Sequence, residues 1–193
     1  MRAAMELFIE RGYGDATVAE IAERAGLTKR TFFRHFADKR EILFNDQEAL
    51  RRLFADAITG APATATPMEA IGVGLAVFAA DLGDEQRGFP AQRQAIIDAN
   101  PDLQERELLK RAALTAVMAE ALCERGVEEL TASIAAQLGA LAFNAAFLRW
   151  LEPANQQTLP ELAEKTLREL TAATEALRGS DCWLFTDQGV VEV

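Results

Sequence analysis

Residues 17–39 read TVAEIAERAGLTKRTFFRHFADK, and this stretch decides the fold of the N-terminal part of the chain. Its spacing predicts two short helices joined by a turn at Gly26. Thr17 and Glu20 form the pattern of a capping box, in which each side chain bonds the backbone N–H of the other. Thr28 is placed to cap the second helix, and Gly26 can end the first in the left-handed conformation open to glycine. Two short helices around a sharp turn are typical of a helix-turn-helix unit.

The same stretch concentrates positive charge in an acidic protein. The chain has 193 residues and a formal net charge of −10, yet the segment from Arg24 to Arg40 holds six cations and one acid. Residues 1–52 carry ten Lys/Arg against nine Asp/Glu, whereas residues 53–193 carry ten against twenty-one. A run of cations on a helix is usually a solvated face, but such a helix also suits the DNA major groove. Any nucleic-acid contact is therefore expected in the N-terminal part.

Apolar residues recur at intervals of three and four along the rest of the chain, which predicts further helices. These helices are expected before Gly12, over Asp38–Ile58 and Met68–Leu82, through Ile96 and Ile97, and over Asn100–Gly126, Leu130–Leu151 and Pro160–Arg178. Asn100 is placed to cap the long helix that Pro101 opens. Leu130–Leu151 is apolar nearly all round, so burial on more than one face is expected. The Pro/Thr/Ala stretch at residues 60–67 is the candidate domain boundary, and residues 180–193 match no helix.

The residue types that most enzyme and metal sites require are scarce. The single histidine, His35, excludes an HExxH motif and leaves a His-based triad unsupported. The two cysteines, Cys123 and Cys182, lack metal-binding spacing and indicate a reduced, cytoplasmic protein, with Cys123 expected as a small hydrophobe in an apolar helix. The run Ala70–Ala80 is shorter than the ~20 apolar residues that a membrane helix needs. We expect no enzymatic activity, cofactor, metal or membrane span.

The run ELFIERGYGDATVAEIAERAGLTKRTFFRHFADKREIL resembles the DNA-binding domain of the TetR family of bacterial transcription regulators. The family pattern is an amphipathic helix ending LFxExGY, followed by TTVxxIAxxAGVSxGTFYxYFxSKExL, and the agreement covers most of residues 4–44. Residues 60–193 resemble the family only in being helical. Phe33 replaces the usual tyrosine, Arg30 stands where many members have glycine, and the basic lead-in typical of the family does not precede the first helix.

The resemblance implies an all-α fold, with an N-terminal three-helix helix-turn-helix domain followed by a larger helical domain. The expected divisions are a DNA-binding domain at 1–45, a connecting helix at 46–59, a ligand-binding and dimerisation domain at 60–179, and a tail of unassigned role at 180–193. The resemblance places Thr17, Thr28, His35 and Lys39 at phosphates, and the first turn of helix 29–36 at bases. The expected DNA contacts are Thr17, Thr28, Lys29, Arg30, Thr31, Phe33, Arg34, His35 and Lys39.

The resemblance further implies a ligand-responsive regulator, most often a repressor, that binds a palindromic double-stranded DNA operator as a homodimer. The helices Leu130–Leu151 and Pro160–Arg178 would pair with their copies as a four-helix bundle. A small apolar or amphipathic effector would release the DNA, and a fatty-acyl-like molecule is one expectation because some family members sense such molecules. The candidate effector contacts are Leu75, Phe78, Phe89, Arg93, Ile96, Ile97, Arg111, Leu114, Met118, Phe143 and Phe147.

Two alternatives stay open at this level. The aromatic stripe at Phe143, Phe147 and Trp150 is also what ordinary core packing produces. The basic segment could instead contact a protein or an RNA, which would make the chain an all-helical small-molecule-binding or adaptor protein. Binding to double-stranded DNA that weakens steeply with salt distinguishes the regulator from the adaptor.

Overall fold

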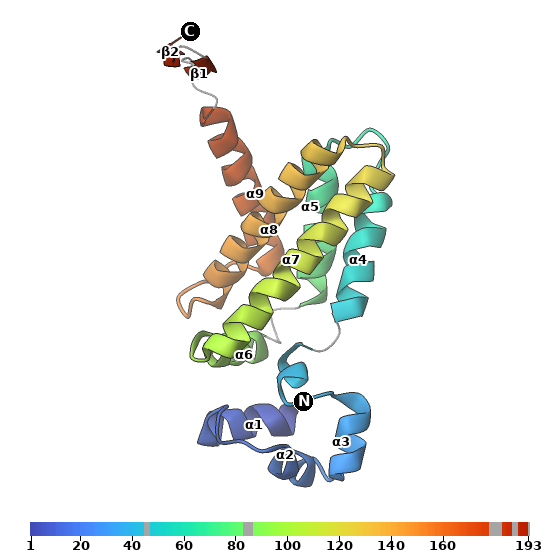
Figure 1. The fold of residues 1–193 in the computed structure, drawn as a ribbon, viewed down its shortest axis with the longest axis vertical. Coiled ribbons are helices and arrows are strands. Elements are labelled where there is room, and N and C mark those ends of the chain that lie inside the picture. The colour runs from blue at the N-terminus through green and yellow to red at the C-terminus, as the bar shows by residue number, and fades with distance from the viewer. Residues whose placement is uncertain (45–46, 83–86, 178–182, 187–188, 193) are drawn as a thin grey trace.

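The computed structural model describes residues 1–44, 47–82, 87–177, 183–186 and 189–192. This part of the chain forms a small head at one end, residues 1–44, and a larger body built from α4 to α9 (Figure 1). The elements are α1 (Arg2–Arg11), α2 (Val18–Arg24), α3 (Lys29–His35), the 3₁₀ helix η1 (Arg40–Phe44), α4 (Gln47–Thr59), α5 (Pro67–Asp81), α6 (Gly88–Asp98), α7 (Pro101–Glu124), α8 (Glu129–Leu151), α9 (Leu159–Ala176), β1 (Trp183–Thr186) and β2 (Gly189–Glu192).

The predicted helical architecture is confirmed, and the C-terminal tail adds a hairpin to it. Strands β1 and β2 pair in antiparallel register, with Trp183 opposite Glu192 and Thr186 opposite Gly189. Aromatic and β-branched residues are common in this tail, and such residues favour strands. The hairpin lies beyond the end of α9, away from the helices of the body (Figure 1).

The single helix expected over Asp38–Ile58 is divided into η1 and α4. The Asp38 carboxylate begins η1 by accepting from the backbone N–H groups of Arg40 at 2.8 Å and Glu41 at 3.1 Å. Three consecutive residues of η1, Ile42, Leu43 and Phe44, are all buried. An α-helix on a flat surface buries only one stripe of residues, so this burial reflects the position of η1 between the head and the body.

Helix N-termini are fixed largely by local side chains. The predicted capping box of Thr17 and Glu20 opens α2, and two further boxes open α5 and α9. The long helix α7 begins at Pro101, as predicted, but the predicted cap by the Asn100 side chain is wrong. Its amide instead donates to the carbonyl of Ile96 at 2.6 Å, because α6 ends directly against the start of α7.

The hydrophobic core of the head extends into the body. Ile96 and Ile97 of α6 and Leu103 of α7 belong to the same buried cluster as Phe8, Phe32 and the other apolar residues of the head. A second cluster fills the body between α4, α5, α7 and α8, and a third surrounds Trp150. Helix α7 therefore runs from the core of the head into the core of the body.

Helix α8 buries small residues on its inner face and exposes large apolar residues on its outer face. Its buried residues are Ala132, Ala135, Ala136, Gly139, Ala142, Ala146 and Trp150. The exposed residues are Leu130, Ile134, Leu141 and Leu148, so burial on several faces is not reached within one chain. Among the described residues, α8 is also the one helix long and apolar enough to cross a membrane. An 18-residue segment of it has a mean hydropathy of 1.4, and 33% of that segment is buried. A core helix of a soluble protein passes the same test.

Candidate nucleic-acid interface

The helix-turn-helix unit is held by short-range bonds that the sequence predicts. The Thr17 hydroxyl donates to the Glu20 carboxylate at 2.7 Å and accepts from the Glu20 backbone N–H at 3.3 Å. These bonds with Thr17, together with the nearby charge of Arg11, hold the pKa of Glu20 below its usual value. Gly26 closes α2 with φ at 69°, in the left-handed region. The turn between α2 and α3 therefore has a defined geometry before any partner binds.

Helix α3 has one face in the core of the head and one face in solvent. Phe32 is buried, and its ring lies 5.3 Å from the ring of Phe36. Phe33 projects off this face and is 55% exposed. An aromatic ring at such a position is available to an apolar group such as a thymine methyl. Helix α3 therefore packs Phe32 and Phe36 against the core of the head and presents Phe33 to solvent.

The basic residues of the head divide into paired and unpaired ones. Four are paired with acids: Arg2 with Glu6, Arg11 with Glu20, Arg24 with Glu10, and Arg40 with Asp38. Lys29 and Arg30, at the exposed start of α3, have no hydrogen bond or ion pair with any described residue. Arg34 approaches only the ring of His35, at 3.4 Å. The positive charge available to a partner is thus concentrated on the outer surface of α3.

The three predicted threonine contacts also serve the local fold. Thr28 accepts from the backbone N–H of Thr31 at 3.1 Å, and the two hydroxyls lie 3.0 Å apart. Thr17 is engaged in its capping box. A phosphate oxygen accepts hydrogen bonds, so a threonine hydroxyl can contact it only through its single proton. The Thr17 proton is donated to Glu20, so a phosphate would have to displace that carboxylate, whereas the pair of Thr28 and Thr31 keeps one hydroxyl proton free.

Lys39 is placed differently from the other predicted phosphate contacts. Its Nζ donates to the carbonyls of Tyr13 at 2.7 Å, Gly14 at 2.9 Å and Ala16 at 3.1 Å. The same ammonium lies 4.5 Å from the centroid of the Tyr13 ring. Lys39 thus faces the loop between α1 and α2, whereas Lys29 and Arg30 face solvent.

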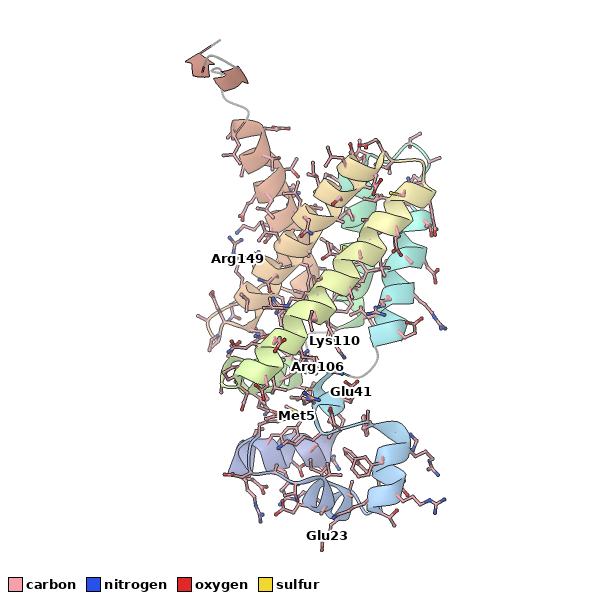
Figure 2. The ribbon with its side chains drawn as sticks, in the orientation of Figure 1. Met5, Glu23, Glu41, Arg106, Lys110 and Arg149 are labelled. Atoms are coloured by element: carbon pink, nitrogen blue, oxygen red, sulfur yellow. The ribbon has the colours of Figure 1, made fainter. Side chains whose placement is uncertain are left out.

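The junction between head and body is built around the ring of Phe44. Three cations surround this buried ring, with Lys110 Nζ at 4.7 Å, Arg93 Cζ at 5.1 Å and Arg106 Cζ at 5.9 Å from its centroid. Glu41 pairs with Arg106 and approaches Lys110 at 3.9 Å, and Figure 2 shows these three side chains together between head and body. Lys110 also donates to the Phe44 carbonyl at 2.8 Å.

Burial and neighbouring charge set two pKa values at this junction. Burial, together with the charges of Arg106 and Arg93, lowers the pKa of Lys110 to about 8, and the opposing charge of Glu107 does not offset them. Burial alone would raise the pKa of Glu107, but the charges and hydrogen bonds of Arg93 and Arg111 outweigh it and hold that pKa below its usual value. Among the described residues, no group of three or more His, Cys, Asp or Glu is arranged to bind a metal ion.

The predicted effector contacts separate into two groups. On α6, Phe89, Ile96 and Ile97 pack with the core of the head, while Arg93 donates to the Leu43 carbonyl at 2.7 Å and to Glu107 at 2.7 Å. The other members lie in or against the core of the body: Leu75, Phe78, Leu114, Met118, Phe143 and Phe147. Arg111 lies between these groups, bonded to Glu107 and to Asn144.

An aromatic series runs through the body. Phe78 lies 5.3 Å from Phe54 and 4.9 Å from Phe143, measured between ring centroids. Phe147 continues the series at 5.8 Å from Phe143 and 5.9 Å from Trp150. The effector contacts predicted from the sequence include three of these rings but omit Phe54 and Trp150, because only the fold joins the five rings into one series.

Two surface depressions are found on the described part of the chain. One, of about 490 Å³, lies between α1 and α6 and is lined by Ile96 among others. The other, of about 720 Å³, lies between α7 and α8 and is lined by Cys123. Cys123 is exposed, so the prediction that it packs as a small hydrophobe is wrong: it lies on the outer side of α7. Cys182 lies outside the described residues.

Residues 1–45 match the sequence model described as bacterial regulatory proteins, tetR family. The chain is 39% identical over 88 residues to the HTH-type transcriptional regulator TcmR of Streptomyces glaucescens. The aligned segment covers 46% of this chain and 38% of TcmR. The chain thus aligns with well under two thirds of the length of that relative. These sequence matches are to transcriptional regulators, in line with the expectation that the chain is not an enzyme.

Solved structures match nearly the whole chain. The transcriptional regulator FadR of Bacillus subtilis in complex with stearoyl-CoA has a TM-score of 0.60 at 20% identity, over 88% of this chain and 94% of that one. The TetR-family repressor FadR of Thermus thermophilus in complex with lauroyl-CoA has a TM-score of 0.52 at 26% identity, over 88% and 90%. The head of this chain, residues 1–45, therefore matches the DNA-binding domain of the TetR family of bacterial transcriptional regulators, and the chain as a whole shares the fold of solved TetR-family regulators.

Proposed function

We propose that this chain is a repressor that binds a palindromic DNA operator as a homodimer through α3 and leaves it when a small apolar or amphipathic effector binds the body. The outer surface of α3 carries the proposal. Lys29 and Arg30 are exposed there without an acidic partner among the described residues, next to the exposed ring of Phe33. Unpaired cations are free to neutralise phosphates or to read guanine in the major groove.

The outer face of α8 supports the homodimer. Leu130, Ile134 and Leu141 are 66%, 52% and 52% exposed, and Leu148 continues the same stripe two turns later. The neighbouring helix α9 exposes alanines near its C-terminal end, which allow a second helix to approach closely. A two-fold axis through these helices would present two copies of α3 to successive major grooves, about 34 Å apart or a multiple of that distance.

One pair of variants tests the dimer. Ile134→Glu places a charge in the middle of the proposed interface, whereas Leu109→Glu places one on α7, where the leucine is 65% exposed and off the stripe. Light scattering should give a dimeric mass for the unmodified chain and for Leu109→Glu, and a monomeric mass for Ile134→Glu. A monomer before any substitution would contradict this part of the proposal.

The body suits an effector with an apolar part and an acidic head group. The aromatic series from Phe54 to Trp150 offers apolar surface in the body, and the cations Arg93 of α6 and Arg111 of α7 lie near the junction. Both cations are paired with Glu107, so an acidic head group would have to compete with that carboxylate. The complexes of the two FadR proteins with stearoyl-CoA and lauroyl-CoA support an acyl ligand as the class to test first.

Helix α7 provides the physical link between effector and DNA. Leu103 is buried in the core of the head, and Met118 and Leu122, on the same helix, are buried in the core of the body. An effector that shifts α7 would therefore shift the head. The effector changes the population of the DNA-binding state only as far as its affinities for the two states differ.

Binding to double-stranded DNA at several salt concentrations tests the proposal. The logarithm of the binding constant should fall linearly with the logarithm of salt concentration, by about 0.9 per phosphate neutralised. Arg30→Ala should change the preferred sequence, whereas Lys165→Ala, which removes an exposed cation on α9, should leave both affinity and preference unchanged. Binding to RNA or to a protein without any preference for double-stranded DNA would favour an adaptor.

The effector is tested on the same complex. Lauroyl-CoA should release the chain from DNA, and coenzyme A without the acyl chain serves as the control. Release by neither compound would reject the acyl class while leaving the DNA-binding part of the proposal intact. Release by both would show that the coenzyme, and not the apolar chain, is recognised.

A further inference from the structure

We infer that Lys39 is a positioning residue, which fixes the loop between α1 and α2 against the end of the recognition unit, and that it does not bind phosphate. The inference rests on the proposed function, because it concerns how the head presents α3 to DNA. It also departs from the role that the family resemblance implies for this lysine.

The hydrogen-bonding capacity of Lys39 is fully used inside the head. A lysine ammonium has three donors and no acceptor. Its three donors are satisfied by the carbonyls of Tyr13, Gly14 and Ala16, at 2.7, 2.9 and 3.1 Å. A phosphate oxygen could accept from the ammonium only by displacing one of these carbonyls. Lys39 would therefore have to break an existing hydrogen bond to bind phosphate, whereas Lys29 and Arg30 would not.

The three carbonyls depend on Lys39 in turn. No other hydrogen bond to any of them is found among the described residues. Ala16 is 1% exposed, so water cannot easily replace the ammonium at its carbonyl. A buried carbonyl without a donor is unfavourable, and three converging carbonyls repel one another when the cation is removed. Lys39 therefore satisfies three carbonyls of this loop, beside the backbone bond from the Ala16 N–H to the Gly12 carbonyl at 3.3 Å.

The bond network shows what Lys39 positions. Lys39 lies between the end of α3 at His35 and the start of η1 at Arg40, whereas the loop that it contacts joins α1 to α2. Its ammonium also lies 4.5 Å from the Tyr13 ring, which packs edge-on against Phe8 of α1 at 5.1 Å. One side chain thus ties the end of α3 to α1 and to the start of α2. The orientation of α3 relative to the rest of the head follows from that connection.

The test compares Lys39→Met and Lys39→Arg with Lys29→Gln as the matched control, all in the full chain. Methionine keeps the apolar stem and removes the ammonium. Arginine keeps the charge, but its planar fork of donors cannot converge on three carbonyls as an ammonium does. Lys29 is exposed and unpaired, so its replacement should remove a phosphate-neutralising charge without disturbing the head.

Two measurements separate positioning from phosphate binding. Without DNA, Lys39→Met and Lys39→Arg should lose hydrogen-exchange protection at residues 16–20 and lower Tm by about 2–12 °C, whereas Lys29→Gln should change neither. On a selected DNA sequence, Lys29→Gln should reduce the salt slope by about 0.9 for each phosphate that is no longer neutralised. Lys39→Met should weaken binding with the salt slope unchanged, and Lys39→Arg should not restore affinity.

The outcomes that overturn the inference are distinct from those that overturn the proposed function. Unchanged exchange and Tm in Lys39→Met would reject the positioning role, whatever happens on DNA. Full affinity in Lys39→Arg together with a reduced slope in Lys39→Met would establish a phosphate contact instead. If the unmodified chain binds no double-stranded DNA, the proposed function fails, while the exchange measurement still decides the role of Lys39 in the head.

Discussion

Replacing Phe44 by leucine removes the ring around which the head and the body are joined. Phe44 is 2% exposed and has Lys110, Arg93 and Arg106 within 6 Å of its ring centroid, the nearest at 4.7 Å. A cation over an aromatic face contributes about 0.5–2 kcal/mol, and three cations that share one ring do not add in full. Leucine keeps apolar volume but leaves a gap, which adds about 1 kcal/mol. We expect Phe44→Leu to lower the free energy of unfolding by about 2–4 kcal/mol.

The matched control is Phe54→Leu in the body. Phe54 is 1% exposed, and its ring lies 5.3 Å from the ring of Phe78, with no cation over it among the described residues. Loss of an aromatic pair and the accompanying gap should cost about 1–2 kcal/mol. Urea unfolding of the two variants, followed by circular dichroism, measures the difference. Equal destabilisation by both would show that the cations around Phe44 contribute nothing and would refute the account of the junction.

Two further predictions concern the body. The pKa of Lys110 is lowered from 10.5 to about 8, so between those pH values the unfolded chain binds a proton that the folded chain has released, and stability should rise with pH. When urea unfolding is measured from pH 7 to 10, the free energy of unfolding of the unmodified chain should rise by about 1–3 kcal/mol, and Lys110→Met should remove that rise. If the two chains show the same dependence of unfolding free energy on pH, the lowered pKa of Lys110 is contradicted. At Gly139 a Cβ would overlap the Cγ2 methyl of Ile71, so Gly139→Ala should destabilise the chain by about 1–2 kcal/mol despite the better helix propensity of alanine. Gly88→Ala, where a Cβ meets nothing within 4 Å, is the control, and equal Tm values for the two variants would contradict the close packing of α5 and α8.

Local features of the fold could be predicted from the sequence, because local side chains determine them. The box of Thr17 and Glu20 and the left-handed Gly26 need only neighbouring residues, and both are present. The same Thr-x-x-Glu pattern occurs at Thr66 and Thr158 and could have been used to place the starts of α5 and α9. The cap expected from Asn100 failed because a carbonyl of the preceding helix competes for its side chain.

Features that depend on tertiary contacts could not be predicted in this way. Nothing in the spacing of Ile96 and Ile97 indicates that they pack with the head, since the apolar face of a helix does not show which other element it packs against. The family resemblance implies a phosphate contact for Lys39, and only the fold shows that three carbonyls surround it. Charge pairing explains the difference within the basic segment: Arg24 and Arg40 have acidic partners in the fold, whereas Lys29 and Arg30 have none among the described residues.

The central claim is that two copies of α3 read one DNA site. Hydroxyl-radical footprinting on a sequence selected from a random pool of double-stranded DNA tests it most directly. Two equal protected regions related by two-fold symmetry, with centres one helical turn of about 10–10.5 base pairs apart or a multiple of it, are predicted. The protection should disappear when Lys29 and Arg30 are both replaced by glutamine. A single protected region, or two regions that persist in that double variant, would contradict the account.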